Sequence, residues 1–128
     1  MDVASPALVA LVSCAALLLF VVAIRRERER HRAAHRADLL IREFLSSEEL
    51  AELEERGCLV VASRAHPGRL YRVPAWPGWI TVLQDGRPIA WLCLRPTRAL
   101  PPRELVIVHK LMLEADEEAY WRLANRVP

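Results

Sequence analysis

The stretch that decides how this chain is built is VASPALVALVSCAALLLFVVAI, residues Val3–Ile24. It carries no charged side chain, and from Ala7 onward only Ser13 and Cys14 interrupt its apolar residues. As an α-helix, rising about 1.5 Å per residue, it is roughly 30 Å long, which matches the hydrocarbon core of a bilayer. We therefore predict a transmembrane helix over residues 1–24.

Two other interpretations of this segment fit less well. A cleavable signal peptide has a basic N-terminal region before a shorter apolar core, whereas this N-terminus has Asp2 and no Lys or Arg. The tetrapeptide Leu11–Cys14 resembles a lipoprotein cleavage box, but the basic start is again missing and ten more apolar residues follow Cys14. A single span remains the prediction.

A basic segment follows the span, and we assign residues 25–37 to a charged helical stalk beside the membrane. Its six arginines are Arg25, Arg26, Arg28, Arg30, Arg32 and Arg36. Because positive charge collects on the cytoplasmic side of a span, we expect the N-terminus outside and the following domain in the cytoplasm. The same arginines can contact anionic lipid headgroups.

Charge and cysteine content limit the classes of partner and cofactor that we expect. From Ala37 onward, twelve basic residues meet thirteen acidic ones, so the domain is balanced and nucleic acid is not an expected partner. The three cysteines are widely spaced and form no CxxC pair, which fits a reducing compartment. His31 and His35 lie one helical turn apart, but the arginines around them oppose a cation. We predict no metal and no cofactor.

The remaining residues, 38–128, are expected to form one small cytoplasmic domain. Ser46 and Glu49 make a capping box for a helix over 47–56, which Gly57 ends in a left-handed conformation. Apolar and β-branched runs then predict strands, separated by turns that contain Pro and Gly. The strands are expected at 58–62, 70–73, 79–83 and 89–94.

The dipeptide Asp85-Gly86 predicts a two-residue hairpin turn between the last two of these strands. In the simplest register Val82 opposes Ile89 and Ile80 opposes Trp91. Those four side chains and Cys93 would then share the face that lies on the core.

A final helix is expected over 102–125, with a break near Asp116. Its buried stripe should consist of Leu105, Val108, Met112, Ala115, Ala119 and Leu123. The predicted fold class is therefore α+β: a transmembrane helix with its stalk, then a small antiparallel sheet of three or four strands flanked by two helices on one face.

Candidate catalytic residues are few. Cys93 and His109 are the one plausible thiol–imidazole pair of the domain, and against this stands the simpler interpretation of a core cysteine and a histidine at the edge of the core. The sequence contains no HExxH, GxSxG or phosphate-binding glycine motif. The acidic cluster formed by Glu114, Asp116, Glu117 and Glu118 is expected to be a solvated helix face.

Aromatic side chains are the candidates for a partner interface, because Trp and Tyr favour surfaces that are apolar at one end and wet at the other. These candidates are Tyr71, Trp76, Trp79 and Trp121. The sequence thus favours a non-enzymatic, single-pass membrane protein whose domain binds a protein partner. The alternatives are a membrane-tethered thiol enzyme that uses Cys93 and His109, and a sensor of anionic lipid that acts through Arg25–Arg36.

Overall fold

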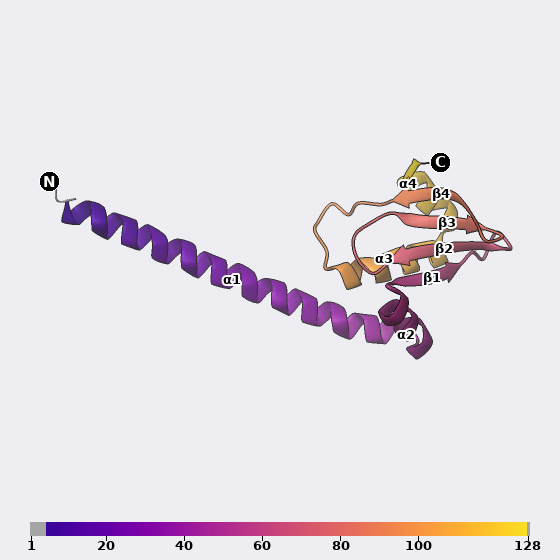
Figure 1. Ribbon diagram of the computed structural model, residues 1–128, viewed down its shortest axis with the longest axis horizontal. Coiled ribbons are helices and arrows are strands. Elements are labelled where there is room, and N and C mark those ends of the chain that lie inside the picture. Colours follow the sequence, from indigo (N-terminus) through magenta and orange to yellow (C-terminus); the bar gives the residue numbers. More distant parts are fainter. Residues whose placement is uncertain (1–4, 128) are drawn as a thin grey trace. The chain divides into compact units, whose positions relative to one another are not determined.

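The computed structural model describes residues 5–127 (Figure 1). Residues 1–4 of the predicted span and Pro128 of the predicted domain lie outside the described residues. The chain divides into two compact units, residues 1–35 and residues 36–128.

The first element is α1 (Pro6–Phe44), a helix of 39 residues that contains no break. Among the residues described, this is one helix long and apolar enough to cross a membrane, and none of its apolar window is buried. It continues without interruption through the basic segment, as expected for a helical stalk. Its last turns join the C-terminal unit, where Ala37 and Ile41 are buried.

The second helix confirms the capping prediction. α2 (Ser47–Arg56) begins at Ser46, whose hydroxyl accepts a hydrogen bond from the Glu49 N–H at 3.1 Å, while the Glu49 carboxylate accepts one from the Ser46 N–H at 2.9 Å. It ends at Gly57, which has a positive φ of 68°. Only glycine adopts this left-handed conformation without a steric cost from Cβ.

The sheet has five antiparallel strands in the order β1-β2-β3-β4-β5, so each strand pairs with its neighbour in sequence. Their bounds are β1 (Cys58–Ala62), β2 (Arg69–Pro74), β3 (Ile80–Gln84), β4 (Arg87–Cys93) and β5 (Asn125–Val127). The first four agree with the predicted strands to within two residues. The fifth was not predicted, because three residues at the end of a helical pattern carry no periodic signal of their own.

The core lies between one face of this sheet and the helices. Alternate strand residues point to it and are fully or nearly fully buried: Leu59, Val61, Tyr71, Val73, Ile80, Val82, Ala90 and Leu92. Figure 1 shows α3 (Pro102–Ala115) and α4 (Glu117–Leu123) on the same side of the sheet, so the opposite face is left open. The predicted last helix, here α3 and α4, thus lies on one face, whereas α2, the other predicted helix, contacts the edge strand β1.

The predicted register of the hairpin is wrong beyond its first two pairs. Gln84 opposes Arg87 and Leu83 opposes Pro88 as expected, but the register then shifts, so that Val82 opposes Ala90. Ile89 is the additional residue of a β-bulge. Proline cannot donate to a ladder and is tolerated at bulges, and Pro88 lies directly before the additional residue. Ala90 and Leu92 therefore face the core, whereas Ile89 and Trp91 are exposed.

The predicted stripe of the last helix is also wrong by one position. The helix breaks at Asp116 as expected, but its buried residues are Val106, Ile107, His109, Leu113, Glu117 and Tyr120. Two neighbouring stripes satisfy helical spacing here, because Val106, Ile107 and Val108 are consecutive and all apolar. The sequence favoured the stripe without polar residues, whereas the structure buries the one that contains His109 and Glu117.

Candidate functional site

An exposed aromatic loop connects β2 to β3. Pro74 ends β2, and Pro77-Gly78 keeps the loop out of the ladder, so Trp76 and Trp79 project from it with 69% and 48% of their surface exposed. One edge of the Trp76 ring lies over Gly57, since a Cβ atom at Gly57 would stand 3.4 Å from the ring. The loop thus presents two large side chains that the described part of the chain leaves mostly uncovered.

A cavity of about 250 Å³ opens beside this loop. Its lining residues are Pro77, Gly78, Trp79, Cys93, Leu94, Arg95, Pro96, Leu105 and His109. The structure therefore brings Cys93 and His109 to the same cavity, as the thiol-enzyme interpretation requires. Its volume lies below the range of about 300–1,000 Å³ that is usual for ligand pockets in proteins.

His109 is a buried core residue, and its predicted place at the edge of the core is wrong. Its side chain is 5% exposed, its Nδ1 atom is hydrogen-bonded to the Tyr120 hydroxyl at 2.7 Å, and the two rings meet edge to face at 5.9 Å. Burial lowers the pKa of His109 to about 4. The imidazole is therefore neutral near pH 7, so it supplies no positive charge that would favour a thiolate at Cys93.

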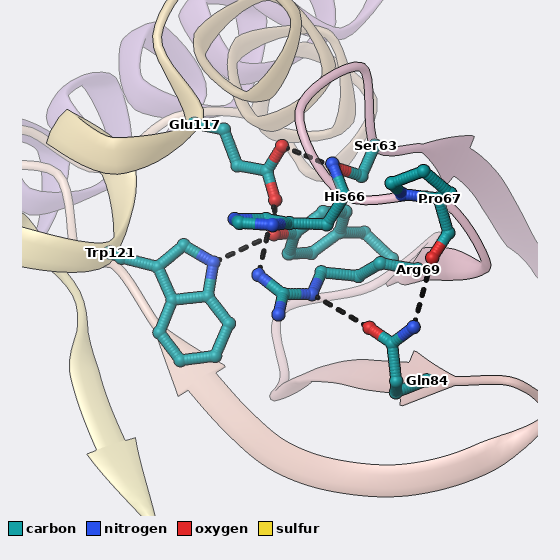
Figure 2. A network of polar contacts seen from close by, with 8 residues as sticks. Ser63, His66, Pro67, Arg69, Gln84, Glu117 and Trp121 are labelled. Carbon is teal, nitrogen blue, oxygen red and sulfur yellow. Dashed lines mark hydrogen bonds and ion pairs between the residues drawn. The ribbon is translucent and has the colours of Figure 1, made fainter.

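A second constellation, which the sequence did not indicate, lies where α4 packs on the sheet (Figure 2). The Glu117 carboxylate accepts hydrogen bonds from the Ser63 hydroxyl at 2.5 Å and from the Tyr71 hydroxyl. The Arg69 guanidinium lies 3.5 Å from the same carboxylate. Glu117 was predicted to be solvated, but its side chain is only 8% exposed.

The network extends from Glu117 on both sides. The Trp121 indole N–H donates to the Tyr71 hydroxyl at 2.7 Å, and the Arg69 guanidinium stacks over the Trp121 ring at 5.5 Å. Arg69 also donates to the side-chain oxygen of Gln84, whose amide nitrogen donates to the Pro67 carbonyl (Figure 2). Tyr71 and Trp121, two candidates for a partner interface, therefore contribute to internal packing. Tyr71 is fully buried, so its assignment to an interface is wrong.

The ionisation of the network follows from these contacts. Burial alone would raise the pKa of Glu117, but hydrogen bonds from Ser63 and Tyr71 and the positive charge of Arg69 lower it below its ordinary value. Burial, together with the hydrogen bond to Glu117, raises the pKa of Tyr71 to about 12. At neutral pH the network thus consists of a carboxylate, a guanidinium and a protonated phenol, each with partners.

Among residues 5–127, no buried side-chain nitrogen or oxygen lacks a hydrogen-bond partner. A catalytic group normally keeps one donor or acceptor directed at its substrate, whereas Glu117, Tyr71 and Ser63 are occupied by one another. We therefore regard this network as structural: it joins α4, β2 and the turn after β1. No local signal could reveal it, because Tyr71 and Glu117 are 46 residues apart.

The stalk arginines lie on the surface of α1. Arg25, Arg26, Arg28, Arg30, Arg32 and Arg36 are all exposed. Glu27 lies 3.8 Å from Arg30 and 3.2 Å from His31. Within the described ranges, no group of three or more His, Cys, Asp or Glu side chains is placed to hold a metal ion.

No protein-family model, no curated protein and no solved structure matches this chain.

Proposed function

We propose that this chain is a single-pass membrane protein whose small α+β domain lies in the cytoplasm and binds a protein partner. The observation that carries the anchor is the exposed apolar surface of α1. Eleven large apolar side chains between Leu8 and Ile24 are exposed, with Leu11 at 71% and Phe20 at 63%. At about 2 kcal/mol for each, covering them is worth on the order of 20 kcal/mol, and a bilayer does so around the whole helix.

The orientation rests on the arginines that follow. Six of them follow Ile24 within residues 25–36, whereas residues 1–24 include no Lys or Arg. This asymmetry favours a cytoplasmic C-terminal side.

The anchor is tested on the full-length chain in cells. We expect it to stay in the membrane pellet after extraction at alkaline pH, and a reporter at its C-terminus to be protected from external protease. Release into the supernatant would refute the anchor, and cleavage of the reporter in intact cells would refute the orientation.

The partner-binding surface that we propose is the loop with Trp76 and Trp79. Exposed tryptophans offer a large apolar contact area, and tryptophan is enriched among the residues that dominate binding energy at interfaces. Tyr71 is excluded by its burial, and Trp121 by its part in the internal network.

This surface is tested by purifying the full chain in a mild detergent. We expect one stoichiometric companion, which is lost from Trp76→Ala and kept by Leu123→Ala. Leu123 is the matched control because it is 64% exposed and lies on α4. A solitary full-length protein, or equal retention by both variants, would contradict the proposed surface.

A tethered thiol enzyme is the second candidate, because Cys93 and His109 line one cavity. The neutral, hydrogen-bonded state of His109 weighs against it. If His109 does not activate the thiol, alkylation of Cys93 by iodoacetamide at pH 7 proceeds at the same rate in the wild type and in His109→Gln. If Cys93 is alkylated about tenfold more slowly in His109→Gln than in the wild type, the enzyme interpretation is restored.

The lipid sensor that acts through Arg25–Arg36 stays a prediction. Its test is whether a fragment without the span, residues 25–128, binds anionic vesicles in a salt-sensitive way. Equal binding to neutral vesicles would count against it.

A further inference from the structure

Charge is segregated between the two layers of the C-terminal unit. Residues 58–98, which contain β1 to β4 and their connections, carry six of the twelve basic residues that follow Ala37 but only one of the thirteen acidic ones, Asp85. The five described strands contain no Asp or Glu at all. The helical layer therefore has a net negative charge, and the sheet layer has a net positive charge.

The open face of the sheet combines one of these basic residues, Arg72, with apolar side chains. One row crosses all five strands directly, from Val60 through Arg72, Thr81 and Trp91 to Val127. Trp91 and Val127 are 37% and 47% exposed, and Ile89 at the bulge is 43% exposed. When one face of a sheet packs on the core and the other meets water, the solvated face is normally polar. This face, in contrast, is largely apolar around Arg72.

Arg72 is available for an external partner. Among the ion pairs within the described part of the chain, Arg69 is the one arginine of residues 58–98 that meets a carboxylate. Arg72 and Arg87 are exposed and meet none there. An anionic surface is thus the complement of this face, and two copies of the chain could not associate through it face to face without bringing like charges together.

We propose that the open face, defined by Val60, Arg72, Thr81, Ile89, Trp91 and Val127, docks on the anionic headgroups of the membrane that holds α1. This inference rests on the proposed anchor. Tryptophan prefers the headgroup level of a bilayer, and the arginine fork matches phosphate oxygens. Because α1 and the domain belong to one chain, docking is an intramolecular step and needs little intrinsic affinity. The negative helical layer, in turn, favours an orientation with the sheet toward the lipid.

The test uses the full-length chain, one copy per nanodisc. The discs are made of phosphatidylcholine alone or of phosphatidylcholine mixed with phosphatidylglycerol, and both contain a small fraction of lipid with a nitroxide on the headgroup. The nitroxide quenches tryptophan fluorescence on contact. We expect stronger quenching in the anionic discs, loss of the difference at high salt, and a smaller quenched fraction in Trp91→Phe.

Charge reversal identifies the face. Arg72→Glu should lower the ratio of docked to undocked domain in anionic discs roughly 30-fold, because two units of charge change near the surface. Arg122→Glu makes the same change on α4, where Arg122 is exposed and paired with Glu118, and should have little effect. Arg72→Lys keeps the charge and should retain most of the quenching, which separates a loss of docking from a loss of folding.

Three results would overturn the proposal: equal quenching in neutral and anionic discs, equal effects of the two reversals, or binding of a single-stranded oligonucleotide that Arg72→Glu abolishes. The last would assign the face to nucleic acid, for which basic and aromatic sheet surfaces are also suited. A failure of the anchor is recognised separately, because the chain would then not enter the discs at all.

Discussion

The hydroxyl of Tyr71 on β2 donates a hydrogen bond to the carboxylate of Glu117, the first residue of α4. This contact joins the second strand of the sheet to the last helix across 46 positions of the chain. It also explains why a carboxylate is tolerated in a buried position: Ser63, Tyr71 and Arg69 together replace the water that Glu117 loses.

Removing either partner should destabilise the domain. We expect Glu117→Gln to lower the free energy of unfolding by about 2–4 kcal/mol, because Arg69 loses its carboxylate in a buried site. Tyr71→Phe should cost about 1–3 kcal/mol, because Glu117 loses a donor. Urea unfolding of the detergent-solubilised full chain, followed by near-UV circular dichroism, measures both.

The control for this pair is Glu118→Gln, which removes an exposed ion pair with Arg122 on the same helix and should cost little. The double variant of Tyr71 and Glu117 should lose less than the sum of the two single variants. Additive losses would show that the two side chains act independently.

His109 should make the stability of the domain depend on pH. Its pKa is about 4 in the folded state and about 6.5 when unfolded. Between these values the unfolded chain binds a proton that the folded chain does not, so the free energy of unfolding should fall as the pH drops from about 6.5 to about 4, by roughly 3 kcal/mol in total.

The variant His109→Gln should flatten this part of the pH profile, whatever its effect on stability at pH 7. His35→Gln is the control, since His35 is exposed on α1. A slope that survives in His109→Gln would mean that other groups cause the acid sensitivity.

The capping box of α2 should contribute measurably to stability. Ser46→Ala removes the acceptor for the Glu49 N–H and should cost about 1 kcal/mol. Ser47 follows at the first helical position and is exposed, so Ser47→Ala should change the unfolding midpoint little. Similar costs for the two serines would indicate that the cap makes no specific contribution.

Gly57→Ala should destabilise the junction between α2 and β1 by about 1 kcal/mol. At the positive φ of 68°, the Cβ atom of alanine is sterically strained against its own backbone, and it would also touch the Trp76 ring at 3.4 Å. Gly78→Ala is the matched control, because no positive φ applies there and its Cβ would meet Pro74 at an ordinary 3.6 Å. Thermal unfolding of the two variants compares them directly.

Local signals in the sequence predicted what is local in the structure. The capping box at Ser46, the left-handed Gly57 and the Asp85-Gly86 turn each depend on a few adjacent residues, and each lies where it was expected. The order of the helices and of the first four strands followed from them, because short connections leave neighbouring strands little choice but to pair.

Features that depend on distant contacts could not be predicted in this way. The buried stripe of α3 and α4 was decided by partners for two polar residues: Tyr120 for His109, and Tyr71 and Ser63 for Glu117. Without knowledge of these partners, burying a histidine and a glutamate looks costly, so the wholly apolar stripe was favoured. Likewise β5 exists only because β4 offers it an edge.

The bulge at Ile89 determines which face of the sheet each later side chain of β4 occupies. Side chains alternate between the two faces with a period of two residues, so one additional residue inverts the assignment of Ala90, Trp91, Leu92 and Cys93. Without it, the small alanine would lie outside and the indole of Trp91 would compete for space in a core already filled by Tyr71 and Tyr120. A single inserted position thus directs a small side chain toward the core and places an indole on the outer face of the sheet.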